Sequence, residues 1–210
     1  MSDIDKTARI YKYMCIARNQ ALVSKATDHK VGAILVRNNT VISTGYNGLP
    51  RGIREHNDPR YKTPNWNIFP DEIIDNLTNI ASKSLYTASA KKQTDPRRLL
   101  GYDSGEATHL VMHVHAELNA ILNAARAGVS TVDADMYCYC GIPCSKCMMA
   151  IINAGIKSVT CLLRKSSLPD NEYLQKSSLK LAAEAGIPII EVPIEEIEKY
   201  ESELVENVLR

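Results

Sequence analysis

A chain of 210 residues, 45% hydrophobic and 23% charged, has the composition of an ordinary globular domain and the length for one buried core. Its net charge of +1 excludes the strongly basic field of many nucleic-acid binders, so no nucleic-acid partner is expected. No apolar run reaches about 18 residues, so no membrane span is expected. The polar N-terminus and six cysteines lead us to expect a cytoplasmic protein (host cytoplasm if the chain is viral).

The first part of the chain predicts a helix and then a hairpin. Residues 7–25 place apolar side chains three and four positions apart, as amphipathic helices do. Two apolar runs, 31–37 and 41–44, flank the turn signal Asn38-Asn39, so we expect two antiparallel strands. The glycine-rich stretch that follows should place Asn47 in a loop. Local chemistry alone favours Asn47 as a turn residue, of a type that tolerates positive φ.

Residues 56–112 differ in character from the rest of the chain. They are rich in proline at their start, then contain a helix-like piece at 71–83 and the basic pairs Lys91-Lys92 and Arg97-Arg98. A structureless loop of this length is uncommon inside a compact domain, so we expect an insertion with elements of its own. The basic pairs fit a solvated surface, with phosphate contacts as the alternative.

The second half of the chain alternates strands with helices. We expect helices at 116–127, 144–153, 171–185 and 194–208, and strands at 135–140, 157–163 and 187–192. This alternation predicts crossover connections and partly parallel pairing, hence an α/β fold. The whole chain, 1–210, is predicted to form one domain, with the insertion at about 56–112 and a helical tail at about 194–210.

The residues with the strongest chemical signal are one histidine, one glutamate and two cysteines. His115 precedes a predicted helix, and Cys144 and Cys147 open the next one, directly after Pro143. Zinc prefers nitrogen and sulfur ligands in tetrahedral geometry, and a site with three protein ligands keeps its fourth position for water. Such a water has a pKa near neutrality. Helix N-termini also stabilise thiolates. The pattern therefore predicts a catalytic zinc site.

Glu117 lies on the same opening turn as His115 and is suited to move protons as a general acid and base. Two alternatives remain at this point. A structural zinc site would need a fourth protein ligand, for which Cys138, Cys140 and His113 are the nearest candidates. A thiol pair that binds no metal is the other. Neither alternative explains a carboxylate two residues after the histidine.

These motifs resemble those of a known family. HAELNAIL, beginning at His115, followed by PCSKC, beginning at Pro143, is similar to the zinc-dependent cytidine/deoxycytidylate deaminase superfamily and, within it, to the deoxycytidylate (dCMP) deaminases. The stretches at 31–33, 43–48 and 153–157 extend the likeness, which covers roughly 7–55 and 113–192. Where many relatives carry Thr-Leu-x before the second motif, this chain has Cys140-Gly141-Ile142. Where they tend to carry a tyrosine after the next strand, it has 164–167 (RKSS).

The resemblance implies a fold and a reaction. The fold would be a three-layer α/β/α arrangement with a five-stranded mixed sheet. The reaction would be hydrolytic deamination of dCMP to dUMP with release of ammonia, which supplies dUMP for thymidylate synthesis. One zinc ion would be held by His115, Cys144 and Cys147, with Glu117 catalytic. The implied nucleotide-binding residues are the following: Asn47, Ala116, Ile142 and Pro143.

The resemblance also implies partners. It points to a homo-oligomer, with a hexamer favoured, activated by dCTP and inhibited by dTTP, with Mg2+ accompanying the triphosphate. Arg126 resembles a position used at the effector site; as the last cation of its helix it also suits the helix dipole. A second, structural zinc (His56, His109, His113, Cys15) is not expected. The alternatives are a deaminase of C5-modified dCMP, dCTP or a cytidine nucleoside, a nucleic-acid-editing deaminase, and a non-catalytic zinc module.

Overall fold

The computed structural model describes residues 3–26, 30–51, 113–163 and 169–208. The chain divides into two units, Met1–Asn47 with His115–Arg210, and Gly48–Val114. In the described part of the second unit, Gly48 and Val114 form an antiparallel bridge. The predicted helical piece at 71–83, the basic pairs, His56, His109 and residues 164–167 lie outside the described residues. A single domain with an insertion over about 56–112 therefore stays a prediction.

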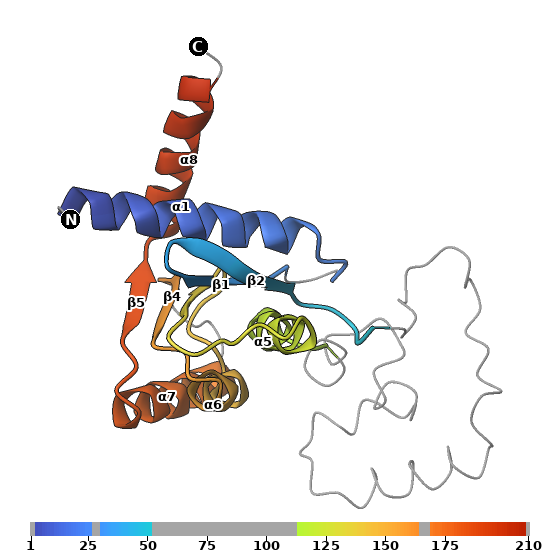
Figure 1. The fold of residues 1–210 in the computed structure, drawn as a ribbon. Helices are drawn as coiled ribbons and strands as arrows, with labels where there is room; N and C mark the ends of the chain where they lie inside the picture. Colours follow the sequence, from blue (N-terminus) through green and yellow to red (C-terminus); the bar gives the residue numbers. More distant parts are fainter. Residues whose placement is uncertain (1–2, 27–29, 52–112, 164–168, 209–210) are drawn as a thin grey trace, which may run out of the picture. The chain divides into compact units, whose positions relative to one another are not determined.

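A five-stranded mixed sheet forms the centre of the first unit (Figure 1). Its strand order is β2-β1-β3-β4-β5. The strands are β1 (Gly32–Arg37), β2 (Thr40–Tyr46), β3 (Asp135–Cys138), β4 (Ser158–Leu162) and β5 (Ile189–Val192). β1 runs antiparallel to both of its neighbours, while β3, β4 and β5 are parallel. The predicted mixed sheet with crossover connections is confirmed.

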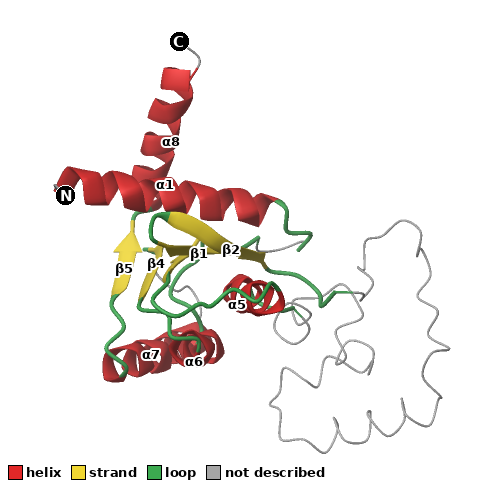
Figure 2. Cartoon of the chain, in the orientation of Figure 1, coloured by secondary structure: helices red, strands yellow, loops and turns green. Residues whose placement is uncertain are grey.

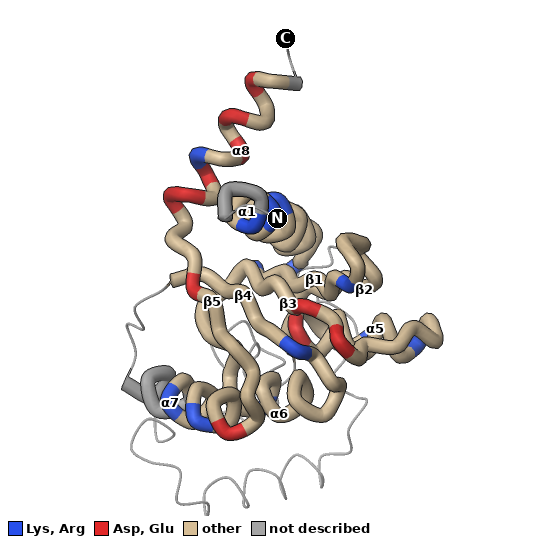
Figure 3. The backbone as a smooth tube through the Cα atoms, turned by 60° about the vertical axis from the view of Figure 1, so that its left-hand side comes forward, with Lys and Arg blue, Asp and Glu red and all other residues tan. Residues whose placement is uncertain are grey.

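Helices cover both faces of this sheet, so the unit has three layers (Figure 2). One face carries α1 (Asp3–Leu22) and α8 (Ile194–Val208). The other face carries α5 (Ala116–Arg126), α6 (Ser145–Asn153) and α7 (Pro169–Glu184). Figure 3 shows acidic residues along α8, of which Glu201 forms an ion pair with Arg18 of α1. The predicted α/β/α fold is confirmed. No described helix has the length and apolarity to span a membrane.

Two glycines let helices approach the sheet very closely, one on each face. A Cβ atom on Gly32 would lie 2.1 Å from the Ala17 carbonyl oxygen of α1, and one on Gly45 would lie 2.3 Å from the Ala116 carbonyl oxygen of α5. No side chain fits at such distances. Both helices carry buried alanines, whose small side chains allow this close approach. On α5 they recur every fourth residue: Ala116, Ala120 and Ala124. The sequence therefore packs the start of α5 directly on β2.

Most element boundaries agree with the predictions to within two or three residues. The turn at Asn38 and Asn39 has φ of 52° and 61°, as a two-residue hairpin requires. The first helix was predicted to reach Lys25 but ends at Leu22. The physical reason is that the Ser24 hydroxyl donates to Asn47, with its oxygen 2.7 Å from the Asn47 carbonyl oxygen, and this holds the chain out of the helix.

Candidate metal and catalytic site

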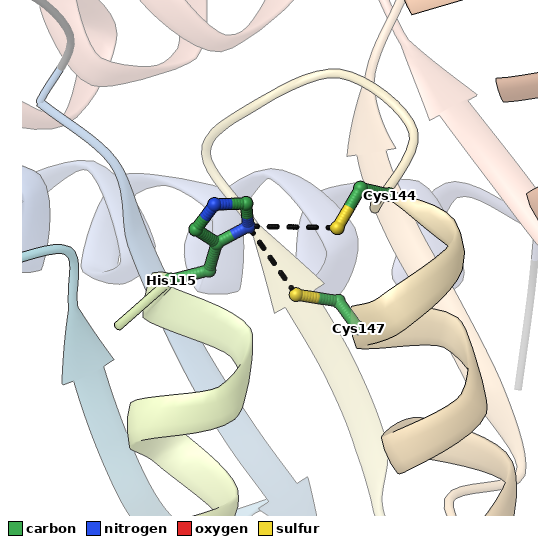
Figure 4. Close-up of side chains that lie close together, drawn as sticks. All are labelled: His115, Cys144 and Cys147. Carbon is green, nitrogen blue, oxygen red and sulfur yellow. Dashed lines mark hydrogen bonds between the residues drawn. The ribbon is translucent and has the colours of Figure 1, made fainter. Parts of the chain in front are cut away.

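Three side chains, from the starts of α5 and α6, converge on one point (Figure 4). The Nδ1 atom of His115 lies 3.6 Å from Sγ of Cys144 and 3.4 Å from Sγ of Cys147. The three ligand atoms all lie within 4.8 Å of one another. The structure thus brings together the histidine and the two cysteines that the sequence singled out.

The local backbone explains why these side chains meet. His115 is the N-cap of α5, with φ −66° and ψ 155°, and Cys144 is the N-cap of α6, with φ −64° and ψ 162°. Cys147 follows on the first turn of α6. The predicted helix from 144 therefore begins one residue later, at Ser145, because Cys144 is extended. The positive ends of two helix dipoles face the same group, which favours thiolate ligands.

The spacing of these atoms fits a zinc ion. Zinc bonds to sulfur and nitrogen of about 2.3 and 2.0 Å, in tetrahedral geometry, place a nitrogen and a sulfur ligand about 3.6 Å apart. The measured separations are 3.6 and 3.4 Å. Among the described residues, no fourth histidine, cysteine or acidic side chain joins the three. Cys138, Cys140 and His113, the candidates for a structural fourth ligand, therefore do not complete the site.

The thiols and the imidazole are coupled electrostatically. Hydrogen bonds, first from the Cys147 thiol and then from His115, lower the pKa of Cys144 to about 4. The pKa of Cys147 is raised, mainly because its thiol donates to Cys144 and because it is buried. The hydrogen bond with Cys144 raises the pKa of His115, against the effect of burial. These contacts favour the thiolate form of Cys144, which is the form that binds a metal cation.

Glu117 lies buried beside this cluster, with 3% of its surface exposed. Burial raises the pKa of its carboxyl group above the ordinary value near 4.5, against a backbone hydrogen bond and the charge of His115. The Sγ atom of Cys140 is 4.0 Å from Glu117 Oε1. A buried carboxyl group with a raised pKa binds a proton more strongly than an exposed one, which suits a group that accepts and returns protons.

Polar side chains that the sequence analysis did not single out fix the helix carrying His115. Asn119 Nδ2 donates to the Tyr46 carbonyl oxygen (2.7 Å), and Asn123 Nδ2 donates to that of Thr44 (2.8 Å). From β2, the Ser43 hydroxyl donates to the Ala120 carbonyl oxygen (2.6 Å). Two asparagines four positions apart beside an alanine stripe were the available signal, because residues at this spacing share a helix face.

Asn47 is buried, and its side chain holds the loop after β2. Its Oδ1 accepts hydrogen bonds from Ser24 Oγ and from the Val31 amide nitrogen, both at 2.8 Å. Asn47 lies in the loop predicted after β2 and is not among the described residues with positive φ, so this loop does not use the positive φ that asparagine tolerates. A role in nucleotide binding stays a prediction.

The remaining predicted residues lie around the same helices. Ala116 is fully buried at the start of α5, Pro143 is buried just before Cys144, and Ile142 is half-buried and packs against the core. Arg126 is exposed in the last turn of α5. Their predicted roles in substrate and effector binding remain untested by the geometry.

In a three-layer α/β/α unit, two helix N-termini bring one imidazole and two thiols beside a buried carboxylate. Zinc-dependent deaminases use this ligand set, with a glutamate that does not bind the metal as general acid and base. The family model for the cytidine and deoxycytidylate deaminase zinc-binding region matches residues 7–163, and the chain belongs to this family. The site therefore lies within the matched region.

Known relatives agree with this assignment. The deoxycytidylate deaminase of Enterobacteria phage T2 is 30% identical over 174 residues, 81% of this chain and 85% of that protein. That of phage T4 is 30% identical over 188 residues, 84% of this chain and 86% of that protein. The crystal structure of dCMP deaminase from the cyanophage S-TIM5 in complex with dCMP and dUMP has a TM-score of 0.54 at 20% identity, covering 91% of this chain and 99% of that one. This last likeness is one of fold.

Proposed function

We propose that this enzyme deaminates dCMP hydrolytically to dUMP and releases ammonia, with zinc as its cofactor. The observation that carries the proposal is the group formed by His115, Cys144 and Cys147, spaced for a tetrahedral cation, with buried Glu117 two residues after the histidine. The names of the phage T2 and T4 relatives support dCMP as the substrate.

The residues divide the work between metal binding and proton transfer. His115, Cys144 and Cys147 would hold zinc, which when bound lowers the pKa of water and acts as a Lewis acid. Glu117 takes a proton from the attacking water and delivers it to the ring nitrogen. It then takes the second proton, from the hydroxyl group now on the ring carbon, and delivers it to the amine, which leaves as ammonia when the C–N bond breaks. Because Glu117 is buried, contact with bulk water does not return the pKa of its carboxyl group to the ordinary value.

Nucleotide binding is proposed for Asn47, in the loop after β2, and for three residues next to the metal ligands in the chain: Ala116, Ile142 and Pro143. The two hydrogen bonds to Asn47 Oδ1 support a fixed orientation for this side chain. Regulation by dCTP and dTTP, with Mg2+ on the triphosphate, through an oligomer and with Arg126 as an effector residue, is part of the same proposal. The exposure of Arg126 is compatible with a ligand reaching it.

The proposal is tested by ammonia release from zinc-loaded protein with dCMP, 5-methyl-dCMP, dCTP and deoxycytidine in parallel, each with and without dCTP or dTTP as effector. We expect turnover of dCMP. Glu117→Gln should retain zinc and lose about 10²–10⁴-fold in kcat. Glu203→Gln, which changes an exposed glutamate of α8, is the matched control and should behave as wild type.

Each arm of this experiment decides a separate point. Turnover confined to another substrate would overturn dCMP and direct attention to the loop Cys140-Gly141-Ile142. Full activity of Glu117→Gln would overturn the catalytic role of the carboxylate. If dCTP and dTTP change the rate for wild type but not for Arg126→Ala, the effector role of Arg126 is supported; an unchanged response removes it.

A further inference from the structure

Helix α7 reaches back to the cysteine motif through one serine. Ser178 is completely buried, and its Oγ lies 2.6 Å from the carbonyl oxygen of Pro143, 35 residues earlier in the chain. α6 and α7 pack side by side on the same face of the sheet (Figure 1). α7 begins at Pro169, beyond the region that the family model matches, 7–163.

The direction of this hydrogen bond is informative. A serine inside a helix commonly bonds back to the carbonyl four residues earlier in its own helix. Ser178 instead donates to a carbonyl outside α7. Pro143 is itself buried, and a buried carbonyl needs a donor because leaving it without one costs about 1–3 kcal/mol. Among the described residues, no other side chain donates to the backbone of 141–147. The contact is therefore a specific tether.

The tether acts on the backbone that aims a metal ligand. The Pro143 carbonyl lies in the peptide plane that joins Pro143 to Cys144, so fixing the carbonyl fixes the orientation of that plane. Cys144 follows in extended geometry, φ −64° and ψ 162°, and directs its Sγ to within 3.6 Å of His115 Nδ1. Rotation of this plane would swing Cys144 relative to Cys147, which is held on the first turn of α6.

We propose that Ser178 is a positioning residue for the thiol half of the metal site. Its hydrogen bond to Pro143 holds the two cysteines in the arrangement that a tetrahedral cation requires, before the cation binds. The inference rests on the proposed function in one respect, namely that His115, Cys144 and Cys147 hold zinc. It needs no particular nucleotide substrate.

The test is the zinc affinity of the full chain, measured by competition with a chromogenic chelator. Ser178→Ala should lower this affinity about 10–100-fold, the usual effect of losing an outer-shell partner. Ser177→Ala is the matched control, because Ser177 is the neighbouring serine of the same helix and only half-buried; its affinity should stay within about twofold of wild type. The Co2+-substituted protein should show shifted sulfur-to-cobalt absorption in Ser178→Ala alone.

Two further variants separate positioning from a loss of stability. Ser178→Thr keeps the hydroxyl donor, whereas Ser178→Cys nearly keeps the volume and donates weakly. If positioning is correct, zinc affinity follows the donor, so threonine restores it and cysteine does not. The inference is overturned if zinc affinity follows the melting temperature across the variants. It is also overturned if Ser178→Ala has the zinc affinity and the cobalt spectrum of wild type. If the wild-type protein binds zinc but does not deaminate dCMP, the proposed substrate is contradicted and the role of Ser178 is not.

Discussion

Helices α5 and α6 each bring ligands to the same group, yet they are attached to the domain in different ways. α5, which follows His115, is fixed to β2 by side-chain hydrogen bonds from Asn119, Asn123 and Ser43 and by the close approach at Gly45. α6, which follows Cys144, buries Met148 and Ile151 in the core, and its start is tethered by Ser178. α5 is fixed by polar contacts along its length. α6 is fixed by apolar packing, by Ser178 at its beginning and, at its far end, by the Thr131 hydroxyl, which donates to the carbonyl oxygen of the C-cap Ala154 (2.7 Å).

This difference assigns different tasks to the two halves of the site. Hydrogen bonds are directional, so three of them along α5 define its position and its rotation, and with these the orientation of His115 and Glu117. Apolar packing tolerates small rotations, because many arrangements bury the same surface. We therefore expect the imidazole and the carboxylate to be preset by the fold, while the thiol pair depends more on Ser178 and on the metal.

The largest effect should come from Gly45, where the attachment of α5 leaves no room. In Gly45→Ala the new Cβ would lie 2.3 Å from both the Ala116 carbonyl oxygen and the Ala120 amide nitrogen, which are backbone atoms and cannot turn aside. The helix must move off β2. We expect a loss of about 3 kcal/mol in the free energy of unfolding, measured by chemical denaturation, together with weaker zinc binding.

Gly48→Ala provides the control for this substitution. Nothing lies within 4 Å of a Cβ built on Gly48, so its stability should change by less than about 0.5 kcal/mol. Equal losses for the two variants would show that the close contact at Gly45 does not matter. The attachment of α5 would then have to be explained by its hydrogen bonds alone.

Removal of the metal should loosen α6 more than α5. The two helices offer a matched pair of amides in their first turns. The Asn119 nitrogen donates to the His115 carbonyl oxygen and the Met148 nitrogen to the Cys144 carbonyl oxygen, both at 2.9 Å. On chelation, we expect hydrogen exchange at Met148 to accelerate on the order of tenfold, and at Asn119 by less than about threefold. Equal acceleration would contradict the division of tasks proposed for the two helices.

The sequence was sufficient for what depends on local patterns. The order of helices and strands followed from apolar periodicity, and the grouping of His115, Cys144 and Cys147 followed from ligand chemistry and helix starts. The resemblance to zinc-dependent deaminases supplied the sheet of five strands, which is confirmed. The helices and strands were accessible because each rests on residues a few positions apart, whereas the grouping of His115 with Cys144, 29 positions away, required the chemistry of metal binding.

What the sequence could not supply rests on contacts between distant residues. Ser178 meets Pro143 across 35 positions, and nothing near Ser178 in the sequence marks it as different from Ser177. The predicted end of the first helix was wrong for the same reason. Ser24 and Asn47, 23 residues apart, hydrogen-bond to each other, and this contact overrides the local preference for helix at Ser24.

The preset position of α5 should also appear in the pH dependence of stability, through Glu117. Burial raises the pKa of this carboxyl group, so the folded state keeps its proton at pH values where the unfolded chain has lost it. Its contribution to stability is complete below the ordinary pKa near 4.5 and is lost as pH rises through the raised value. Glu117→Gln cannot ionise and should gain stability relative to wild type as pH rises.

The comparison is made on chelated protein by chemical denaturation between about pH 5 and pH 8, where groups common to both proteins cancel. With zinc bound, the positive charge favours the carboxylate, so the difference between the two proteins should change less with pH. A difference that is independent of pH in the chelated protein would show that Glu117 is not held in the buried position that the anchoring of α5 imposes.

The smallest effects should come from the two asparagines of α5, taken one at a time. Asn123→Ala removes a partly buried donor to the Thr44 carbonyl and should lower the free energy of unfolding by about 1 kcal/mol. Asn119→Ala removes an exposed donor to the Tyr46 carbonyl, where water can replace the amide, so a smaller loss is expected. Because both act on one helix and one strand, the double variant measures how far they act together. If the two losses simply add, each asparagine acts independently by hydrogen-bonding its own carbonyl group on β2. A double loss larger than the sum would mean that either one alone is enough to keep α5, and with it His115, on the sheet.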